Sequence, residues 1–435
     1  MDMRSDSPER SCALELLNFL DNSPTPFHAV GESIKLLESV GFKELSESES
    51  WEVQKSGAYY VVRNETTLAA FVVGEEPLWD GGVHLLGAHT DSPNLRLKPH
   101  SAYSKDGYLQ LGVEIYGGVL LASWTDRDLG LSGRIIVGDG EGGTRKELVK
   151  IDKPIARIPQ LAIHLNRDVN EKGLLLNKQE HLPPIIGLAD NAKVFGAWLN
   201  QELGLAKEEY ILSFDLMLHP LEKPSLLGLE DEFICSPRLD NLAMCHVGIA
   251  ALCAQAQIKS SKTRMVVIYD HEEVGSSTTQ GAAGTFLSDL LKRLVSVQGG
   301  DTEADCRVRA KSLLLSADMA HAIHPNYAAR HDPEHQPRMN SGPCIKTNAN
   351  ARYATDGTTS AAFELICKSA DVPVQHFVSR SDMPCGSTIG PLSATRVGIP
   401  TVDIGNPMLS MHSAREMSGT LDHVLMLRAV KAFFA

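Results

Sequence analysis

Four apolar runs in this chain each end at a cluster of histidine and carboxylate residues. The runs with their endings are VHLLGAHTD at 83–91, MVVIYDHEE at 265–273, SLLLSADMAH at 312–321 and IPTVDIGNPMLSMH at 399–412. Short apolar runs of this kind are typical of buried strands. Because open α/β sheets bind ligands at the carboxyl ends of their strands, we predict that these clusters meet at one sheet edge.

The length of the chain predicts more than one domain. At 435 residues it exceeds the size that one hydrophobic core usually serves. Apolar spacing predicts helices over 8–19 and 27–40 and at the C-terminus, and a hairpin over 59–74. After Asp240 strand and helix patterns alternate to the end of the chain. The predicted fold is therefore an α/β catalytic domain with a mixed sheet flanked by helices, formed by residues 1–98 and 240–435.

The segment 99–239 has a different texture. It contains short β-branched runs punctuated by glycine, including QLAIHLN at 160–166, and one predicted helix at 192–203. We interpret it as a β-rich domain inserted into the catalytic domain. Ordinary sheet strands with long loops are the alternative, but most of these strand ends carry no ligand cluster.

Composition excludes several classes of partner. The net charge of -13 without a basic block argues against a general affinity for nucleic acid or anionic membranes. No apolar run reaches the roughly 18 residues of a membrane span, and residues 1–11 lack the apolar core of a secretory signal. The eight cysteines form no C-x-x-C pair, so we expect free thiols in a reducing compartment. These features predict a cytoplasmic protein.

His89 and Asp91 follow the first apolar run. Residues two apart in extended backbone point the same way, so Asp91 can lie beside His89 and fix the tautomer that a metal requires. A single histidine and aspartate at this spacing more often mark only the polar end of a strand. Its position directly after an apolar strand favours the metal interpretation.

Glu272 and Glu273 form a sharper signal. Adjacent carboxylates at the mouth of a buried strand repel one another and favour a bound cation. In extended backbone they point in opposite directions, so one can bind a metal while the other takes a proton from water. A solvated loop pair is the alternative for these two residues taken alone.

Asp318, His412 and Asp240 extend the candidate set. Each alone could be a cap or a satisfied polar residue, and Asp240 in particular suits an N-cap before an apolar helix. Two histidines and three carboxylates together suit a pair of zinc-like ions with a bridging aspartate. Such a pair, about 3.5 to 4 Å apart, activates water and polarises a carbonyl. The set predicts amide hydrolysis.

Several ordered segments carry a family resemblance. GAHTDSPNLRLKP, SPRLDN, YDHEEVGS, SADMAHAIHPNY, MPCGSTIGP and MHSAREM resemble the aspartyl aminopeptidase family of dinuclear zinc exopeptidases. The resemblance covers nearly the whole chain. It implies that Glu272 is the general base and that Asp91 orients His89. It implies these ligands: His89 and Asp318 for one ion, Glu273 and His412 for the other, and Asp240 as the bridge.

The same resemblance implies a substrate and an assembly. Lys346 and Tyr353 match residues that bind the acidic side chain of the substrate, and His321 matches another pocket residue. His164 matches a histidine that reaches the active site of a neighbouring subunit. The inserted domain, 99–239, would form dimers that assemble into a tetrahedral dodecamer.

The expected activity is removal of an unblocked N-terminal Asp or Glu from peptides. It would use two divalent ions per subunit, with Zn²⁺ first and Mn²⁺ or Co²⁺ acceptable to the same ligands.

Other functions stay open at this point. A neutral aminopeptidase, a carboxypeptidase or a deacylase could share a two-metal site, and a non-catalytic assembly or cargo scaffold could share the fold. The presence of Glu272 and all five ligands speaks against the scaffold. A nucleotide enzyme finds no support, because GDGEGG at 138–143 lacks the Gly-Lys-Ser/Thr ending of a phosphate loop and reads as a hairpin turn.

Overall fold

The computed structural model describes residues 7–435, which form two compact units. The first unit comprises the chain up to Asp91, Pro224–Met411 and Glu416–Ala435, and the second comprises Ser92–Lys223 and His412–Arg415. Residues 92–98 thus group with the second unit and 224–239 with the first. Residues 1–6 of the predicted catalytic domain, and with them part of the N-terminal stretch from which a secretory signal was excluded, lie outside the described residues.

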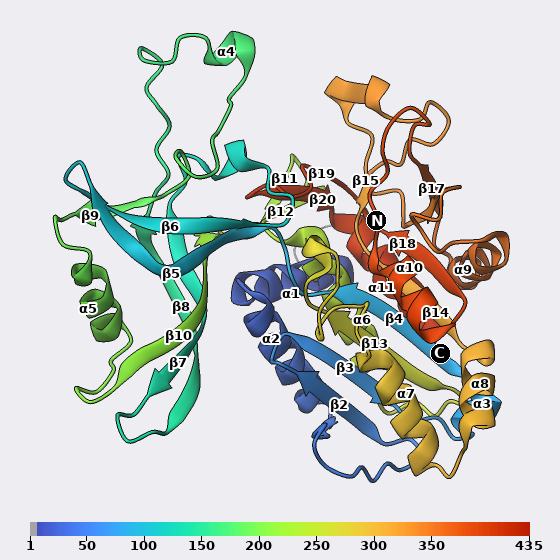
Figure 1. Ribbon diagram of the computed structural model, residues 1–435. Helices are drawn as coiled ribbons and strands as arrows, with labels where there is room; N and C mark the ends of the chain where they lie inside the picture. Colours follow the sequence, from blue (N-terminus) through green and yellow to red (C-terminus); the bar gives the residue numbers. More distant parts are fainter. Residues whose placement is uncertain (1–6) are drawn as a thin grey trace. The chain divides into compact units, whose positions relative to one another are not determined.

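A nine-stranded mixed sheet forms the centre of the first unit (Figure 1). Its order is β1-β2-β3-β13-β4-β14-β18-β16-β17. The strands β13, β4, β14 and β18 run parallel, whereas β3 and β16 pair antiparallel with their neighbours β13 and β18. The strand bounds are Lys43–Glu44 (β1), Ala58–Arg63 (β2), Thr67–Val72 (β3), Val83–His89 (β4), Thr263–Tyr269 (β13), Leu313–Ala317 (β14), Cys344–Thr347 (β16), Gln375–Val378 (β17) and Thr401–Gly405 (β18). The predicted α/β fold with a mixed sheet is confirmed.

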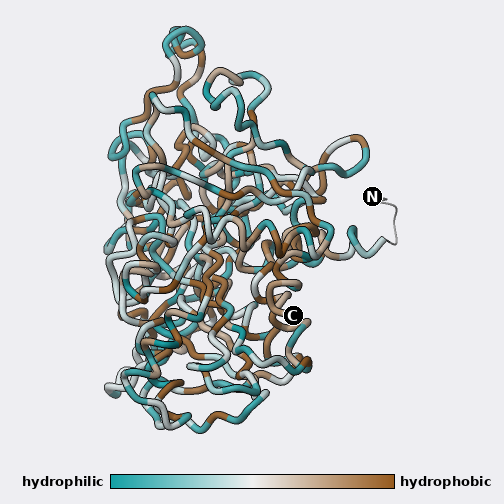
Figure 2. The backbone as a smooth tube through the Cα atoms, turned by 90° about the vertical axis from the view of Figure 1, so that its right-hand side faces the viewer, coloured by the Kyte–Doolittle hydropathy of each residue, from teal (hydrophilic) through white to brown (hydrophobic). Residues whose placement is uncertain are grey.

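Helices cover both faces of this sheet. On β4, Leu86 packs into a core with helices α1, α2, α6, α9 and α11, whereas its neighbour Leu85 packs with α3, α7, α8 and α10. This alternation follows from the two-residue period of a strand. The bounds are Pro8–Asn22 (α1), Pro26–Ser39 (α2), Leu78–Gly81 (α3), Leu239–Ala254 (α6), Phe286–Val297 (α7), Thr302–Lys311 (α8), Gly357–Ser369 (α9), Ile389–Val397 (α10) and Thr420–Phe434 (α11). Figure 2 shows how hydrophobic segments, in brown, alternate with hydrophilic segments, in teal, along the chain.

The first two helices begin where the sequence signals place them. Ser7 and Thr25 are N-caps whose side chains accept hydrogen bonds from the backbone N–H groups of Arg10 and His28. Proline follows each cap, where its missing N–H costs nothing. The predicted helices and the predicted hairpin of β2 and β3 are confirmed.

A smaller five-stranded sheet in the first unit, β11-β12-β20-β19-β15, leads the chain into the candidate site. Its strands are Ser225–Leu227 (β11), Phe233–Ser236 (β12), Ala320–His321 (β15), Pro407–Leu409 (β19) and Glu416–Gly419 (β20). Strand β12 ends just before Asp240, and β19 pairs antiparallel with β20.

The second unit is built on a six-stranded sheet of order β8-β7-β10-β5-β6-β9. Its elements are Asn94–Lys105 (β5), Tyr108–Tyr116 (β6), Leu121–Trp124 (3-10 helix η1), Leu129–Gly138 (β7), Thr144–Ala156 (β8), Val169–Lys172 (α4), Ile185–Leu188 (β9), Lys193–Glu202 (α5) and Tyr210–Pro220 (β10). The GDGEGG segment connects the antiparallel strands β7 and β8, as the hairpin prediction required.

The strand predicted over 160–166 is wrong. The segment has no strand partner and forms a turn around His164. Its apolar side chains are exposed instead of packed: Leu161 is 60%, Ile163 48% and Leu165 75% exposed. The apolar alternation that suggested a strand therefore belongs to an exposed surface of this subunit.

The cysteines agree with the expectation of free thiols. All eight cysteines are free, although Cys306 is exposed and Cys253 and Cys385 are only half-buried. Within residues 7–435, the helices are too short or too polar to cross a membrane.

Candidate metal centre

The register of the parallel strands brings the predicted ligands to one sheet edge. His89 is the last residue of β4 and pairs with Tyr269, the last residue of β13. Ser316 of β14 pairs with Gly87, so two residues further on Asp318 falls level with His89. The apolar runs therefore end together because their strands are aligned.

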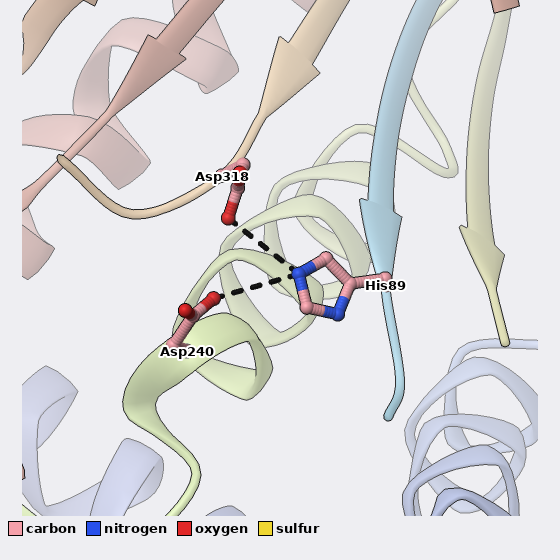
Figure 3. A group of neighbouring side chains, drawn as sticks. All are labelled: His89, Asp240 and Asp318. Atoms are coloured by element: carbon pink, nitrogen blue, oxygen red, sulfur yellow. Dashed lines mark ion pairs between the residues drawn. The ribbon is translucent and has the colours of Figure 1, made fainter. Parts of the chain in front are cut away.

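His89 lies at the centre of the cluster. Its Nε2 atom is 3.4 Å from Oδ1 of Asp240 and 3.5 Å from Oδ1 of Asp318. Figure 3 shows both carboxylates pointing at this one nitrogen, from different elements of the chain. Ligand atoms about 2.0 Å from a tetrahedral ion lie roughly 3.3 Å apart, so the three side chains have the spacing of metal ligands.

Asp91 connects His89 to the Glu272 turn. The Nδ1 atom of His89 is 3.0 Å from the main-chain oxygen of Asp91 and 3.4 Å from its carboxylate. That carboxylate accepts hydrogen bonds from the backbone N–H groups of Glu272 and Glu273, each at 3.1 Å. Asp91 is fully buried. The predicted contact with His89 is present, and the second contact was not foreseen.

The prediction that Glu272 and Glu273 lie in extended backbone is wrong. They begin a 3-10 turn, Glu272–Val274 (η2), flanked by the left-handed residues His271 and Gly275. Two successive N–H groups bonded to one carboxylate require this curled backbone. Even so, ligand atoms of His89, Glu272 and Glu273 all lie within 4.8 Å of one another.

Asp240 is held by two connections at the start of α6. Asp240 and Asn241 have non-helical backbone angles, so the regular part of α6 begins after them, and the alternative of Asp240 as an N-cap stays a prediction. The backbone N–H of Asp240 donates to Oε2 of Glu416 at 3.0 Å. The next residue, Asn241, donates from its side chain to the main-chain oxygen of Ala317 at 2.9 Å, which ties α6 to the end of β14.

The charge of the cluster favours a cation. Burial raises the pKa of Glu272 to about 8, and the nearby carboxylates Asp318, Asp91 and Asp240 add to the rise, whereas His89 opposes it. Burial and Asp240 also raise the pKa of Glu273 well above its usual range. A divalent cation relieves this repulsion, and one imidazole with several carboxylates is a donor set that suits Zn²⁺ and related ions.

His412 lies in the connection between β19 and β20 and groups with the second unit. Within that unit its Nδ1 atom is 3.1 Å from the main-chain oxygen of Gly118. A hydrogen bond of this kind fixes the tautomer and directs Nε2 toward a metal. Its role as a ligand stays a prediction.

Comparison with known proteins identifies the family. Residues 19–434 match the family model of the Aminopeptidase I zinc metalloprotease (M18). The chain belongs to the M18 family. A probable M18 family aminopeptidase 2 of Streptomyces coelicolor is 47% identical to this M18 chain over 423 residues, 96% of each protein.

Solved structures agree. The M18 chain superimposes on a chain in the cryo-EM structure of the Ape4 and Nbr1 complex with a TM-score of 0.94 and 40% identity, covering 100% of this chain and 87% of that one. The structure of the S. cerevisiae mApe1 dodecamer gives a TM-score of 0.85 and 30% identity, covering 97% and 96%. The protein is thus a metallo-aminopeptidase of the M18 family with the fold of its relatives.

Three of the four predicted substrate residues of the M18 chain, Lys346, His321 and Tyr353, lie near Asp318. Lys346 on β16 is only 2% exposed, and its Nζ donates to Oδ2 of Asp318 at 3.3 Å and to the main-chain oxygen of Met319 at 3.1 Å. Its Nζ is 5.3 Å from the centre of the Tyr353 ring. His321 and Tyr353 both line a cavity of about 290 Å³. His164 lies in the second unit, in the exposed turn described above.

Glu416 is a site residue that the sequence reasoning missed. It is 1% exposed and fixes the backbone of Asp240. The residue stands within the segment MHSAREM, but nothing in that segment indicates a partner at position 240. The nearness of Glu416 in sequence to the predicted ligand His412 is a weak signal, and it does not point to position 240.

Proposed function

We propose that this M18 chain removes unblocked N-terminal Asp or Glu residues from peptides with the help of two divalent metal ions. The observation that supports the proposal most is the set of buried ligand atoms around His89, with Asp240 and Asp318 at 3.4 and 3.5 Å from the same nitrogen. Zn²⁺ is the first choice of ion, since the family description names zinc and the donors are nitrogen and oxygen. Mn²⁺ and Co²⁺ suit the same donors.

The ligands would divide between the two ions as follows: His89 and Asp318 would hold one, Glu273 and His412 would hold the other, and Asp240 would serve both. The contacts of His89 with Asp240 and Asp318 support the first group. When bound, such ions polarise the scissile carbonyl and make a water molecule easier to deprotonate. Asp91 keeps the His89 ring in the orientation that leaves Nε2 for the metal.

Glu272 is the general base in this proposal. Its Oε2 atom is 4.0 Å from Nε2 of His89, so it borders the ligands without occupying the place of Asp240 or Asp318. The Glu272 carboxylate accepts a proton from the attacking water and returns it to the leaving amine. The hydrogen bond from its backbone to Asp91 holds the turn in place during both transfers.

Lys346, Tyr353 and His321 would form the pocket for the acidic side chain. Two of the three N–H groups of Lys346 are engaged by Asp318 and Met319, which leaves one for a substrate carboxylate. Because Lys346 is buried, a carboxylate that reaches it gains a strong charge-assisted bond. A substrate with a neutral first side chain leaves the Lys346 cation without a further partner, so the enzyme turns over such a substrate more slowly.

The proposed assembly is a tetrahedral dodecamer built from dimers, and the dimers form through the β-rich domain, predicted over 99–239. Exposed apolar side chains in the second unit support an interface there, including Leu165 at 75% and Leu175 at 85%. The S. cerevisiae relative is described as a dodecamer. His164 stands in this exposed segment, from which it would reach the active site of a neighbouring subunit. We place the protein in the cytoplasm, as its charge and cysteines suggest.

Turnover of a substrate panel tests the proposal. The purified, zinc-loaded protein is assayed on anilides of Asp, Glu, Ala and Leu and on N-acetyl-Asp anilide. We expect the highest kcat/KM with Asp or Glu and none with the acetylated substrate, because the free amine is required. A preference for Ala or Leu would support a neutral aminopeptidase instead.

Two further substrates separate the remaining alternatives. A peptide blocked at its N-terminus with a free C-terminus would be cleaved by a carboxypeptidase, and N-acetyl-Asp would be cleaved by a deacylase. The proposal predicts cleavage of neither. Absence of turnover on every substrate, with the metals bound, would favour the scaffold.

A further inference from the structure

The cavity beside His321 and Tyr353 has an unusual charge for this protein. The whole chain carries a net charge of -13, yet among residues 7–435 no carboxylate lines this cavity of about 290 Å³. Its polar lining includes two arginines and three histidines: Arg330, Arg380, His321, His324 and His331. A wall of this composition complements a negatively charged ligand.

A second cavity of the same size has the opposite character. It is also about 290 Å³ in volume and lies among α1, α2 and α6, where Glu15 and Glu32 line it beside His246. The absence of acidic side chains from the first cavity is therefore not a general property of hollows in this unit.

The two arginines of the first cavity differ in what they bind. Arg380 is engaged, since its Nε and NH2 atoms donate to the carboxylate of Asp382 at 2.8 and 2.7 Å and its NH1 donates to the main-chain oxygen of Ala329. Arg330 ends the 3-10 helix Pro325–Arg330 (η3) and is exposed. Within residues 7–435 its guanidinium makes no hydrogen bond or close ion pair. Arg380 is the main cause of the lowered pKa of Asp382, and Arg330 adds to it only at longer range.

The cavity is continuous with the residues proposed to bind substrate. The rings of His321 and Tyr353 each lie edge-on to the ring of Phe377, with centres 5.6 and 6.4 Å from its centre, and all three residues line the cavity. Lys346 does not line it but lies 5.3 Å from the Tyr353 ring. A carboxylate in the cavity thus has two cations near it. One is the buried Lys346 next to Tyr353, and the other is the exposed guanidinium of Arg330 in the cavity wall.

We infer that Arg330 is a specificity-determining residue that binds a carboxylate of the peptide substrate in this cavity. The inference rests on the proposed aminopeptidase function. A guanidinium can offer two parallel N–H donors to a carboxylate, which fixes its direction as well as its charge. The carboxylate belongs either to the side chain of the first residue or to that of the second, and the experiment distinguishes the two.

Four dipeptide anilides, which carry no C-terminal carboxylate, test the inference: Asp-Ala, Glu-Ala, Asp-Asp and Ala-Ala. The enzyme variants are Arg330→Gln, Arg330→Lys and, as a matched control, Arg338→Gln. Arg338 is an exposed arginine of the same connection that does not line the cavity. All variants are compared in the assembled, metal-loaded form, with folding checked by circular dichroism.

Arg330→Gln is expected to lower one of two ratios of kcat/KM about tenfold, either that of Asp-Ala over Ala-Ala or that of Asp-Asp over Asp-Ala, the effect of losing one charge-assisted contact at an exposed site. Arg330→Lys should recover part of the ratio, and Arg338→Gln should keep it. If Arg330→Gln lowers kcat/KM for Asp-Ala and Glu-Ala relative to Ala-Ala, the carboxylate belongs to the first residue. A fall for Asp-Asp relative to Asp-Ala places it on the second.

Two results would overturn the inference. One is a wild-type pattern of ratios in Arg330→Gln across all four substrates. The other is an equal fall in Arg338→Gln, which would show a general effect of surface charge. A wild-type enzyme that does not prefer acidic substrates would instead overturn the proposed function, so the two failures are distinguishable.

Discussion

The Oδ1 atom of Asp91 accepts a hydrogen bond from the backbone N–H of Glu272 at 3.1 Å. Through its other oxygen the same carboxylate holds Glu273. One buried residue therefore positions three groups. Its carboxylate holds the proposed base and a proposed ligand, and its main-chain oxygen holds the ring of His89. This relationship explains how ligands from separate strands keep a common geometry.

Asp91→Asn should lower kcat by about 10- to 100-fold, the usual effect of removing a group that orients metal ligands. An amide can accept only one of the two N–H bonds, and its NH₂ group faces the other N–H. Steady-state kinetics on an Asp substrate measure the effect. The control is Asp190→Asn, the same change at an exposed residue. A kcat equal to that of the wild type would show that Asp91 positions nothing of importance.

Glu272→Gln should retain both metal ions and lose activity by about 10²- to 10⁴-fold, because an amide cannot accept the proton. The neighbouring change Glu273→Gln is the matched comparison and should lose metal as well as activity. Elemental analysis and turnover are measured on the same samples. If both variants keep their metals and lose activity equally, the two glutamates do not have separate roles.

Mixing two inactive variants tests the role of His164. In assemblies that contain both His164→Ala and Glu272→Gln subunits, an intact base can meet the intact His164 of a neighbour. We expect activity to return when the two proteins are dissociated and reassembled together. If the mixtures stay as inactive as the separate variants, His164 does not act in a neighbouring subunit. It then acts in its own subunit or has no catalytic role.

Two buried histidines predict a loss of stability in mild acid. Nδ1 of His246 lies 3.0 Å from Nε2 of His423. Burial lowers the pKa of His246 from 6.5 to about 4, and burial together with His246 lowers that of His423 well below 6.5. The unfolded chain takes up these protons first, so the free energy of unfolding falls as the pH falls from about 6.5 to 4. Each histidine contributes at most about 1.4 kcal/mol per pH unit.

Chemical denaturation at several pH values measures this slope. His246→Phe should reduce it, since one protonation is removed and phenylalanine can pack against Phe19, whose ring centre is 5.5 Å from that of His246. The exposed His376→Phe is the control and should keep the wild-type slope. An unchanged slope in His246→Phe would mean that other groups cause the acid sensitivity.

The sequence allowed the sheet edge to be predicted, because apolar runs that end in ligands are a local signal and parallel register then aligns them. Glu416 and the second role of Asp91 could not be predicted in this way. Both depend on contacts between residues more than 170 positions apart, since Glu416 and Asp240 are separated by 176 and Asp91 and Glu272 by 181. Such pairings follow from the folded chain alone.

Local patterns also misled in two places. The apolar run at 160–166 resembles a strand, but its side chains are exposed in the single subunit, where no neighbouring strand pairs with it. Glu272 and Glu273 were assigned to extended backbone because a strand precedes them. Their turn is imposed by Asp91, which no pattern around residue 272 reveals.

Stepwise reconstitution of the metal-free protein tests the central claim most directly. Zn²⁺ is added to the apoprotein in known equivalents, and bound metal and hydrolysis of an Asp substrate are measured at each step. The two-ion account predicts that two equivalents bind per subunit and that activity rises with the second. Full activity with one equivalent bound, or activity without any metal, would contradict it.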